Sequence, residues 1–333
     1  MKESLSRVVL SHINAADPEG KSIAGPYGIY GYPTLVLVDA EGRTIDRWIE
    51  YSRDRFLNTL DEALGDLTLL EDKRARHEQA PSAKDAAALG RDHQSRRQHE
   101  EALAYFRAAQ RLGQGTGRDY SYRIFAVLAR RSLMKLRDPE TFAEVKAAAD
   151  AVLSAETRSP VAALNVCGSM ASMARRSGRD SLMAHYLRTG IEAAEAAGEE
   201  MLIRRAKTMA SDYALYVEKD TARAAMLMKA AFPANWEDDV QYLLAYSHWC
   251  SNKAGHLEES RALGERAVSL ASAGDVRSRT LFALAMMRVS KGRIEEALEL
   301  LVRAEAEDPT SSRVRGMLKD IRRIAKEEKR RGK

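Results

Sequence analysis

Residues 34–49 read TLVLVDAEGRTIDRWI, and this stretch decides the fold of the N-terminal part of the chain. Residues 34–38 are apolar or β-branched, as a buried strand requires, and residues 44–49 alternate between polar and apolar. Between them, residues 39–42 form a turn sequence in which Gly42 can take a positive φ. The stretch therefore predicts a β-hairpin.

The sequence on either side of the hairpin predicts a further strand and a helix. Upstream, residues 8–13 form a short apolar, β-branched run, which predicts a buried strand. Downstream, Ser52 is a suitable N-cap for an amphipathic helix. The apolar stripe of that helix comprises Phe56, Leu57, Leu60 and Leu64. Residues 1–66 are therefore expected to form an α+β domain.

Composition changes after this domain. Residues 67–82 are rich in charge and end at Pro81 and Ser82, which fits a linker or a solvated connecting helix. Residues 83–333 are rich in Ala, Leu, Arg and Glu, carry apolar residues at three- and four-residue spacing, and show no strand pattern. They predict an all-α domain.

Two segments of the helical region share one spacing. They are Leu89-Gly90, Ala102, Phe106 and Ala109 in the first and Leu284-Ala285, Ala297, Leu301 and Ala304 in the second. The steps are 13, four and three residues in both. This spacing resembles the tetratricopeptide repeat (TPR), in which small residues let paired helices approach closely.

A looser third copy lies between Ala245 and Ala267, with about three extra residues between its helices relative to the repeat template. Residues 119–233 predict helical hairpins without a fixed repeat register. At about 34 residues per unit, the region has room for roughly six or seven hairpins. Stacked hairpins form a solenoid with a concave face, and the resemblance implies that this face binds a peptide or protein partner. A spacer or a dimerisation surface is the alternative.

Residues 27–35 read YGIYGYPTL and closely resemble the conserved loop of thioredoxins. Together with the hairpin and the flanking elements, the resemblance covers about residues 6–64 and indicates the C-terminal half of that fold. It implies a cis peptide bond between Tyr32 and Pro33. It also implies that Gly31, Tyr32, Pro33 and Thr34 form a loop that docks an extended substrate.

The chain departs from the thioredoxin pattern in its thiols. A thioredoxin places a Cys-x-x-Cys pair ahead of this loop, at a helix N-terminus that lowers a thiol pKa. No cysteine precedes Pro33, and the two cysteines present, Cys167 and Cys250, lie in helical apolar patterns. Glu50 stands where thioredoxins carry a small glycine. We therefore expect no catalytic residue here, and we hypothesise that Met1 is an internal start whose upstream coding sequence supplies the missing half.

Other site chemistry has no support in the sequence. No zinc, calcium, dinucleotide-binding or phosphate-loop motif occurs, so no metal and no cofactor is predicted. No run of eighteen apolar residues predicts a membrane span. The net charge of +5 comes from interspersed residues, and the basic end at 326–333 is interpreted as a solvated tail rather than a nucleic-acid site. The chain as written is expected in the cytoplasm, although an upstream segment could carry an export signal.

Three functions remain open on these grounds. The first is a thioredoxin-like, TPR-containing protein-interaction module that is redox-inactive as it stands. The second is a thiol–disulfide oxidoreductase whose Cys-x-x-Cys half lies outside this chain. The third is a structural repeat scaffold.

Overall fold

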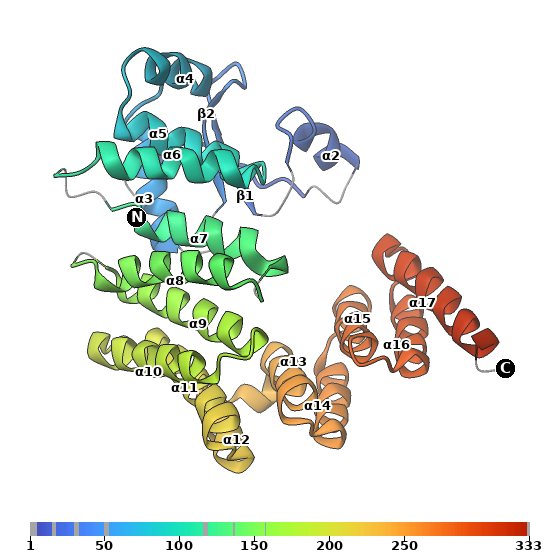
Figure 1. Cartoon of the computed structure of the whole chain (residues 1–333). Coiled ribbons are helices and arrows are strands. Elements are labelled where there is room, and N and C mark those ends of the chain that lie inside the picture. The colour runs from blue at the N-terminus through green and yellow to red at the C-terminus, as the bar shows by residue number, and fades with distance from the viewer. Residues whose placement is uncertain are drawn as a thin grey trace. The chain divides into compact units, whose positions relative to one another are not determined.

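The computed structural model describes residues 5–14, 18–29, 33–49, 53–115, 119–135, 137–156 and 158–331. The described chain is mostly helical and carries a small, two-stranded antiparallel hairpin near its N-terminus (Figure 1). It divides into two compact units, Met1–Tyr186 and Leu187–Lys333. Helix α10 (Asp180–Ala197) runs across the division.

The predicted hairpin is confirmed. Strands β1 (Thr34–Val38) and β2 (Thr44–Ile49) pair antiparallel, with Thr34 opposite Ile49 and an irregularity between Leu37 and Val38. Gly42 has a φ of 77° in the turn, a conformation that glycine adopts without steric cost. Most of β2 is buried, whereas β1 is half-buried. The hairpin therefore has one covered strand and one partly open strand.

The predicted helix after the hairpin is also confirmed, as α3 (Arg53–Leu64). Its Leu60 and Leu64 are buried in one apolar cluster with Trp48 of β2. Phe56 joins this cluster and lies 6.3 Å from the Trp48 ring, measured between ring centroids. Phe56, Leu60 and Leu64 of the predicted apolar stripe thus pack against the hairpin, whereas Leu57 is half-buried outside this cluster.

The prediction of a strand at residues 8–13 is wrong. Residues 9–14 have no regular secondary structure, and Val9 and Leu10 are 99% and 71% exposed. An apolar run becomes a strand only where a second strand satisfies its backbone N–H and C=O groups. Within the described residues the sheet consists of β1 and β2 alone, so no thioredoxin sheet is formed there. A short helix, α2 (Pro18–Ala24), follows instead.

Helices make up the rest of the first unit. They are α4 (Leu70–Gln79), α5 (Ala83–Ser95), α6 (His99–Leu112), α7 (Ser121–Arg131), the 3₁₀ helix η1 (Ser132–Met134), α8 (Pro139–Ser154) and α9 (Pro160–Arg176). From α5 onward they follow one another as layers (Figure 1). Helices α8 and α9 each begin with a proline, Pro139 and Pro160. At this first position the missing N–H of proline costs nothing, because it would have no partner within the helix.

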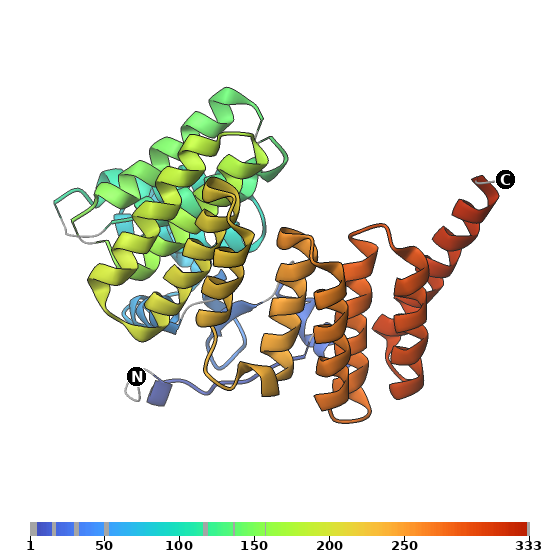
Figure 2. The same cartoon turned by 90° about the horizontal axis from the view of Figure 1, so that it is seen from below.

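The described part of the second unit consists of helices joined by short turns and loops. Its elements are α11 (Glu200–Tyr213), η2 (Ala214–Glu218), α12 (Thr221–Ala230), η3 (Trp236–Asp238), α13 (Val240–Trp249), η4 (Cys250–Ala254), α14 (Leu257–Leu270), α15 (Asp275–Val289), α16 (Ile294–Glu307) and α17 (Ser312–Arg331). Helices α13 to α16 stand side by side (Figure 2). The looser third copy predicted near residue 255 contains η4, a π-helical segment that directly follows α13. No helix in the described ranges is long and apolar enough to cross a membrane.

The shared spacing of the two sequence segments corresponds to shared burial. Ala102, Phe106 and Ala109 are 0% exposed on α6, and Ala297, Leu301 and Ala304 are 0% exposed on α16. In both units these residues face the preceding helix of an antiparallel pair, α5 with α6 and α15 with α16. Residues at equivalent positions of α6 and α16 are therefore buried in the same way against the preceding helix.

A repeated turn between paired helices was not predicted. Five such turns hold a residue in the left-handed region, namely Arg97, Gly178, Lys219, Gly255 and Gly292. In each turn, the N–H of the residue that follows donates a hydrogen bond to the carbonyl five or six residues before it. This bond satisfies a carbonyl at the C-terminal end of the first helix that has no partner within the helix. Glycine adopts this conformation freely, whereas a residue with a Cβ pays about 1 kcal/mol. Arg97 and Lys219 therefore carry backbone strain that the glycine turns avoid.

Helix α4 lies within the predicted linker at 67–82 and is not solvated all round. Lys73 is 2% exposed, and its Nζ donates to the carbonyls of Ile45 at 2.7 Å and Asp66 at 3.0 Å. Burial lowers the pKa of Lys73, while the nearby Asp46 and Asp66 carboxylates act in the opposite direction. The helix is thus tied to β2, and the predicted domain boundary at 67–82 stays a prediction.

Buried charges also join the hairpin to the first helical pair. Asp46 of β2 accepts from the Arg91 guanidinium of α5 at 2.5 and 3.2 Å, and these residues are 1% and 3% exposed. Arg91 also pairs with Glu62 of α3 at 2.9 Å. Because the pair is buried, each charge depends on the other for the interactions that water would otherwise provide.

Candidate functional site

The predicted docking loop is only partly described. Gly31 and Tyr32 lie outside the described residues, and so does the peptide bond expected to be cis. Pro33 is exposed in a bend, and Thr34 begins β1 opposite Ile49. These observations neither confirm nor contradict a docking role, which stays a prediction.

A buried arginine holds the segment that leads into this loop. The Arg47 guanidinium donates to the carbonyls of Tyr27 and Gly28, the latter at 2.7 Å, and its Nε lies 4.0 Å from a carboxylate oxygen of Asp92 on α5. The Tyr27 hydroxyl donates to the Gly42 carbonyl at 3.1 Å. Residues 27 and 28 are therefore fixed to the hairpin, and Arg47 in turn lies beside Asp92 of the first helical pair.

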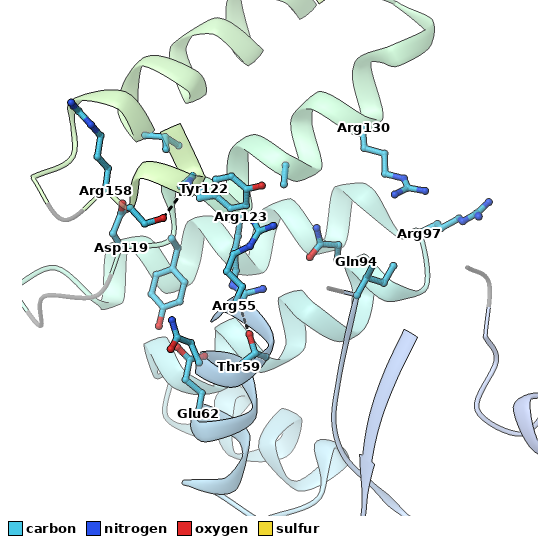
Figure 3. Close-up of a pocket in the computed structure, with 17 residues that line it drawn as sticks. Arg55, Thr59, Glu62, Gln94, Arg97, Asp119, Tyr122, Arg123, Arg130 and Arg158 are labelled. Atoms are coloured by element: carbon cyan, nitrogen blue, oxygen red, sulfur yellow. Dashed lines mark hydrogen bonds between the residues drawn. The ribbon is translucent and has the colours of Figure 1, made fainter. Parts of the chain in front are cut away.

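A pocket of about 490 Å³ lies within the first unit, beside the end of the hairpin. Ile49, the partner of Thr34 in the hairpin, contributes to its wall. The other walls come from α3, from the C-terminal end of α5 and the turn after it, from α7 and the residues just before it, from Val152 of α8, and from the start of α9 and the residues just before it (Figure 3). Helices α5, α7 and α9 are alternate helices of the array. The pocket thus lies where the hairpin's helix meets the face made by alternate helices.

Arginines dominate the charge of this pocket. Its lining contains five of them: Arg55, Arg97, Arg123, Arg130 and Arg158. Its two carboxylates, Glu62 and Asp119, already have partners, because Glu62 pairs with Arg91 and Asp119 accepts from the Ser121 N–H at 2.9 Å. Excess positive charge therefore remains in the pocket.

Two of the arginines tie α3 to α7. The Arg55 guanidinium carbon lies 4.3 Å from the centroid of the Tyr122 ring, within the range of a cation–π contact. Arg123 donates to the Thr59 hydroxyl at 2.9 Å. The partners in these two contacts are neutral, and the contacts orient the guanidinium groups within the pocket lining.

The other three arginines are exposed at the pocket's ends. Arg158 donates to the Leu153 carbonyl, again a neutral acceptor. In the part of the chain that the structure describes, Arg97, Arg130 and Arg158 make no ion pair with a carboxylate. Figure 3 shows Arg158 at one end of the pocket and Arg97 with Arg130 at the other.

The titration of His99 reflects the positive field at the Arg97 end. Burial lowers the pKa of His99, and the charges of Arg130, Arg97 and Arg131 lower it further, while Glu100 acts in the opposite direction. A buried Nδ1 on this ring has no hydrogen-bond partner among the described atoms. The neutral imidazole is therefore favoured beside two of the pocket arginines.

Pocket arginines escaped detection in the sequence because they share no local motif. They come from α3, from the turn after α5, from α7 and from the segment just before α9, spread over residues 55 to 158. The only signal was the net positive charge of +5, which does not say where the charges gather.

Thiol and metal chemistry have little support in the described residues. Cys167 and Cys250 are free and fully buried, and burial raises the pKa of each thiol to about 12. No group of three or more His, Cys, Asp or Glu side chains in the described ranges could hold a metal ion. The arginine pocket is thus the site with the clearest binding chemistry.

No family model matches the sequence, and no curated protein matches it. Any functional assignment therefore depends on the residues and geometry described above.

Proposed function

We propose that this chain is a protein-interaction module with a thioredoxin-like N-terminal part and a TPR-like helical array, redox-inactive as it stands. It binds a segment of a partner protein on the face made by alternate helices of the array. The observation that carries this proposal is the pocket of about 490 Å³ that borders the end of the hairpin and is lined mainly by α3, α5 and α7, with residues at the start of α9 and one residue of α8. Its size is within the range of ordinary ligand pockets.

Two features support binding rather than chemistry. The helical pairs pack through small residues at equivalent positions, as stacked repeats do, and such arrays offer extended surfaces to partners. The pocket lining contains anchoring groups of the kind found at interfaces, arginine and tyrosine, together with small apolar residues that include Ala126 and Ala162.

Substituting Ala126 of α7 tests the location of the binding face. Peptides selected from a random library on the full chain are expected to bind it in solution, and Ala126→Phe should weaken that binding at least tenfold, because the ring fills the pocket. Ala147→Phe, which adds the same ring at an exposed position of α8, should leave binding unchanged. Isothermal titration calorimetry measures both, and circular dichroism verifies that each variant is folded.

Retention of binding by Ala126→Phe, and by Ala162→Phe on α9, would place the binding face elsewhere. Failure of the selection to yield any peptide that binds the full chain would favour the scaffold function instead.

Thiol reactivity separates this function from an oxidoreductase that works with the cysteines of this chain. Only a thiolate attacks a disulfide, and a pKa of about 12 leaves almost none at neutral pH. Cys167 and Cys250 should therefore not react with an aromatic disulfide reagent in the folded protein, and both should react in guanidinium chloride. Rapid reaction of either thiol in the native state, with insulin reduction that a Cys→Ser change abolishes, contradicts the proposal.

A further inference from the structure

We infer that the arginine pocket binds an acidic, extended segment of the partner protein, whose carboxylates pair with arginines from Arg158 at one end to Arg97 and Arg130 at the other. This inference rests on the proposed function and specifies the chemistry of the bound partner.

The positive charge of the pocket favours an anionic ligand. All five cationic side chains of the pocket are arginines, whose planar guanidinium matches a carboxylate with two parallel hydrogen bonds. The pocket's own carboxylates are engaged by Arg91 and by the N-terminal end of α7. A neutral or basic segment would leave the guanidinium groups of Arg97, Arg130 and Arg158 without a counter-charge on binding.

The distribution of the charges selects a segment with several carboxylates over one compact anion. Arg97 and Arg130 lie together, since both act on His99, whereas Arg158 lies at the opposite end of the pocket (Figure 3). A single phosphate is one compact group, whereas these arginines stand at two ends of the pocket. A chain in extended conformation advances about 3.3 Å per residue and carries side chains to both.

The position of Arg97 adds an independent argument. It occupies the left-handed position of the α5–α6 turn, where three of the five corresponding turns have glycine. Strained residues of this kind tend to persist at binding sites, where the side chain is needed. Arg97 is also an exposed residue that lines the pocket, so its side chain is available to a ligand.

The test uses two labelled peptides of about eight residues, one with glutamate at alternate positions and one with glutamine at the same positions. The glutamate peptide should bind the full chain at least tenfold more tightly by fluorescence anisotropy. Its affinity should fall as salt rises from about 0.05 to 0.5 M, because salt screens exposed charges.

Replacement of Arg97 by glycine separates binding from stability. Arg97→Gly should weaken binding of the glutamate peptide severalfold while raising the melting temperature by about 2–4 °C, since it relieves the strained turn. Lys219→Gly is the matched control, because it relieves the same backbone conformation in the second unit and Lys219 does not line the pocket. It should raise the melting temperature and leave peptide binding unchanged. Arg130→Gln should also weaken binding severalfold.

Three results would overturn the inference. One is equal binding of the two peptides, and another is unchanged binding in both Arg97→Gly and Arg130→Gln. The third is tighter binding of a neutral peptide carrying one phosphoserine, or of a single-stranded oligonucleotide, through the same arginines. If library-selected neutral peptides still lose affinity in Ala126→Phe, the proposed function stands and the acidic preference alone is wrong.

Discussion

Replacing Arg91 by methionine is expected to lower the free energy of unfolding of the first unit by about 3–5 kcal/mol, the usual cost of leaving one partner of a buried ion pair alone. Asp46 is 1% exposed and takes two hydrogen bonds from the Arg91 guanidinium, at 2.5 and 3.2 Å. Methionine matches the length of the arginine stem but supplies no charge. Denaturant unfolding followed by circular dichroism measures the loss, and faster hydrogen exchange at the β2 amides locates it.

A double variant shows whether the loss of stability in Arg91→Met comes from the Asp46 charge that is left buried without its partner. Asp46→Leu together with Arg91→Met removes both charges, and apolar replacement of a buried pair is often close to neutral. The double variant should therefore be more stable than Arg91→Met alone. Removing Arg43, which pairs with Asp39 on the surface at 2.7 Å, should have little effect because water replaces the lost partner. An Arg91→Met protein as stable as the parent contradicts the importance of this pair.

This ion pair also shows where sequence reasoning stops. The hairpin at residues 34–49 and helix α3 were predictable, because apolar periodicity and turn chemistry are local. The partners of Asp46, Lys73 and Arg91 lie on other elements, and no local pattern reports them. Residues 67–82 therefore looked solvated although Lys73 is buried.

The run at residues 8–13 shows the same limit in the opposite case, because here the sequence predicted an element that does not form. Its composition suits a strand, yet Val9 is 99% exposed. A strand needs hydrogen-bonding partners from a second segment, and the described sheet offers none to this run. The docking loop was predicted through a family resemblance, whereas the pocket arginines, gathered from four parts of the chain, could be found only in three dimensions.

Local spacing was more informative within the helical pairs, and Gly90 gives the clearest test of it. Gly90 of α5 faces Phe106 of α6, which is 0% exposed. A Cβ at residue 90 would lie 2.7 Å from two carbons of the Phe106 ring, closer than real Cβ contacts permit. Gly90→Ala should therefore destabilise the first unit by about 1–3 kcal/mol, although alanine is the better helix former by about 1 kcal/mol.

The same substitution at Gly168 should have the opposite sign. Gly168 lies within α9, and a Cβ there would meet no atom within 4 Å, so Gly168→Ala should stabilise the unit by up to about 1 kcal/mol. Thermal and denaturant unfolding measure both variants. Combining Gly90→Ala with Phe106→Leu should recover part of the loss, because the smaller side chain makes room for the new methyl group, and the two effects then fall short of additivity. If Gly90→Ala stabilises the protein as Gly168→Ala does, α5 and α6 do not pack as closely as described, and the glycine in the repeated spacing has no structural role.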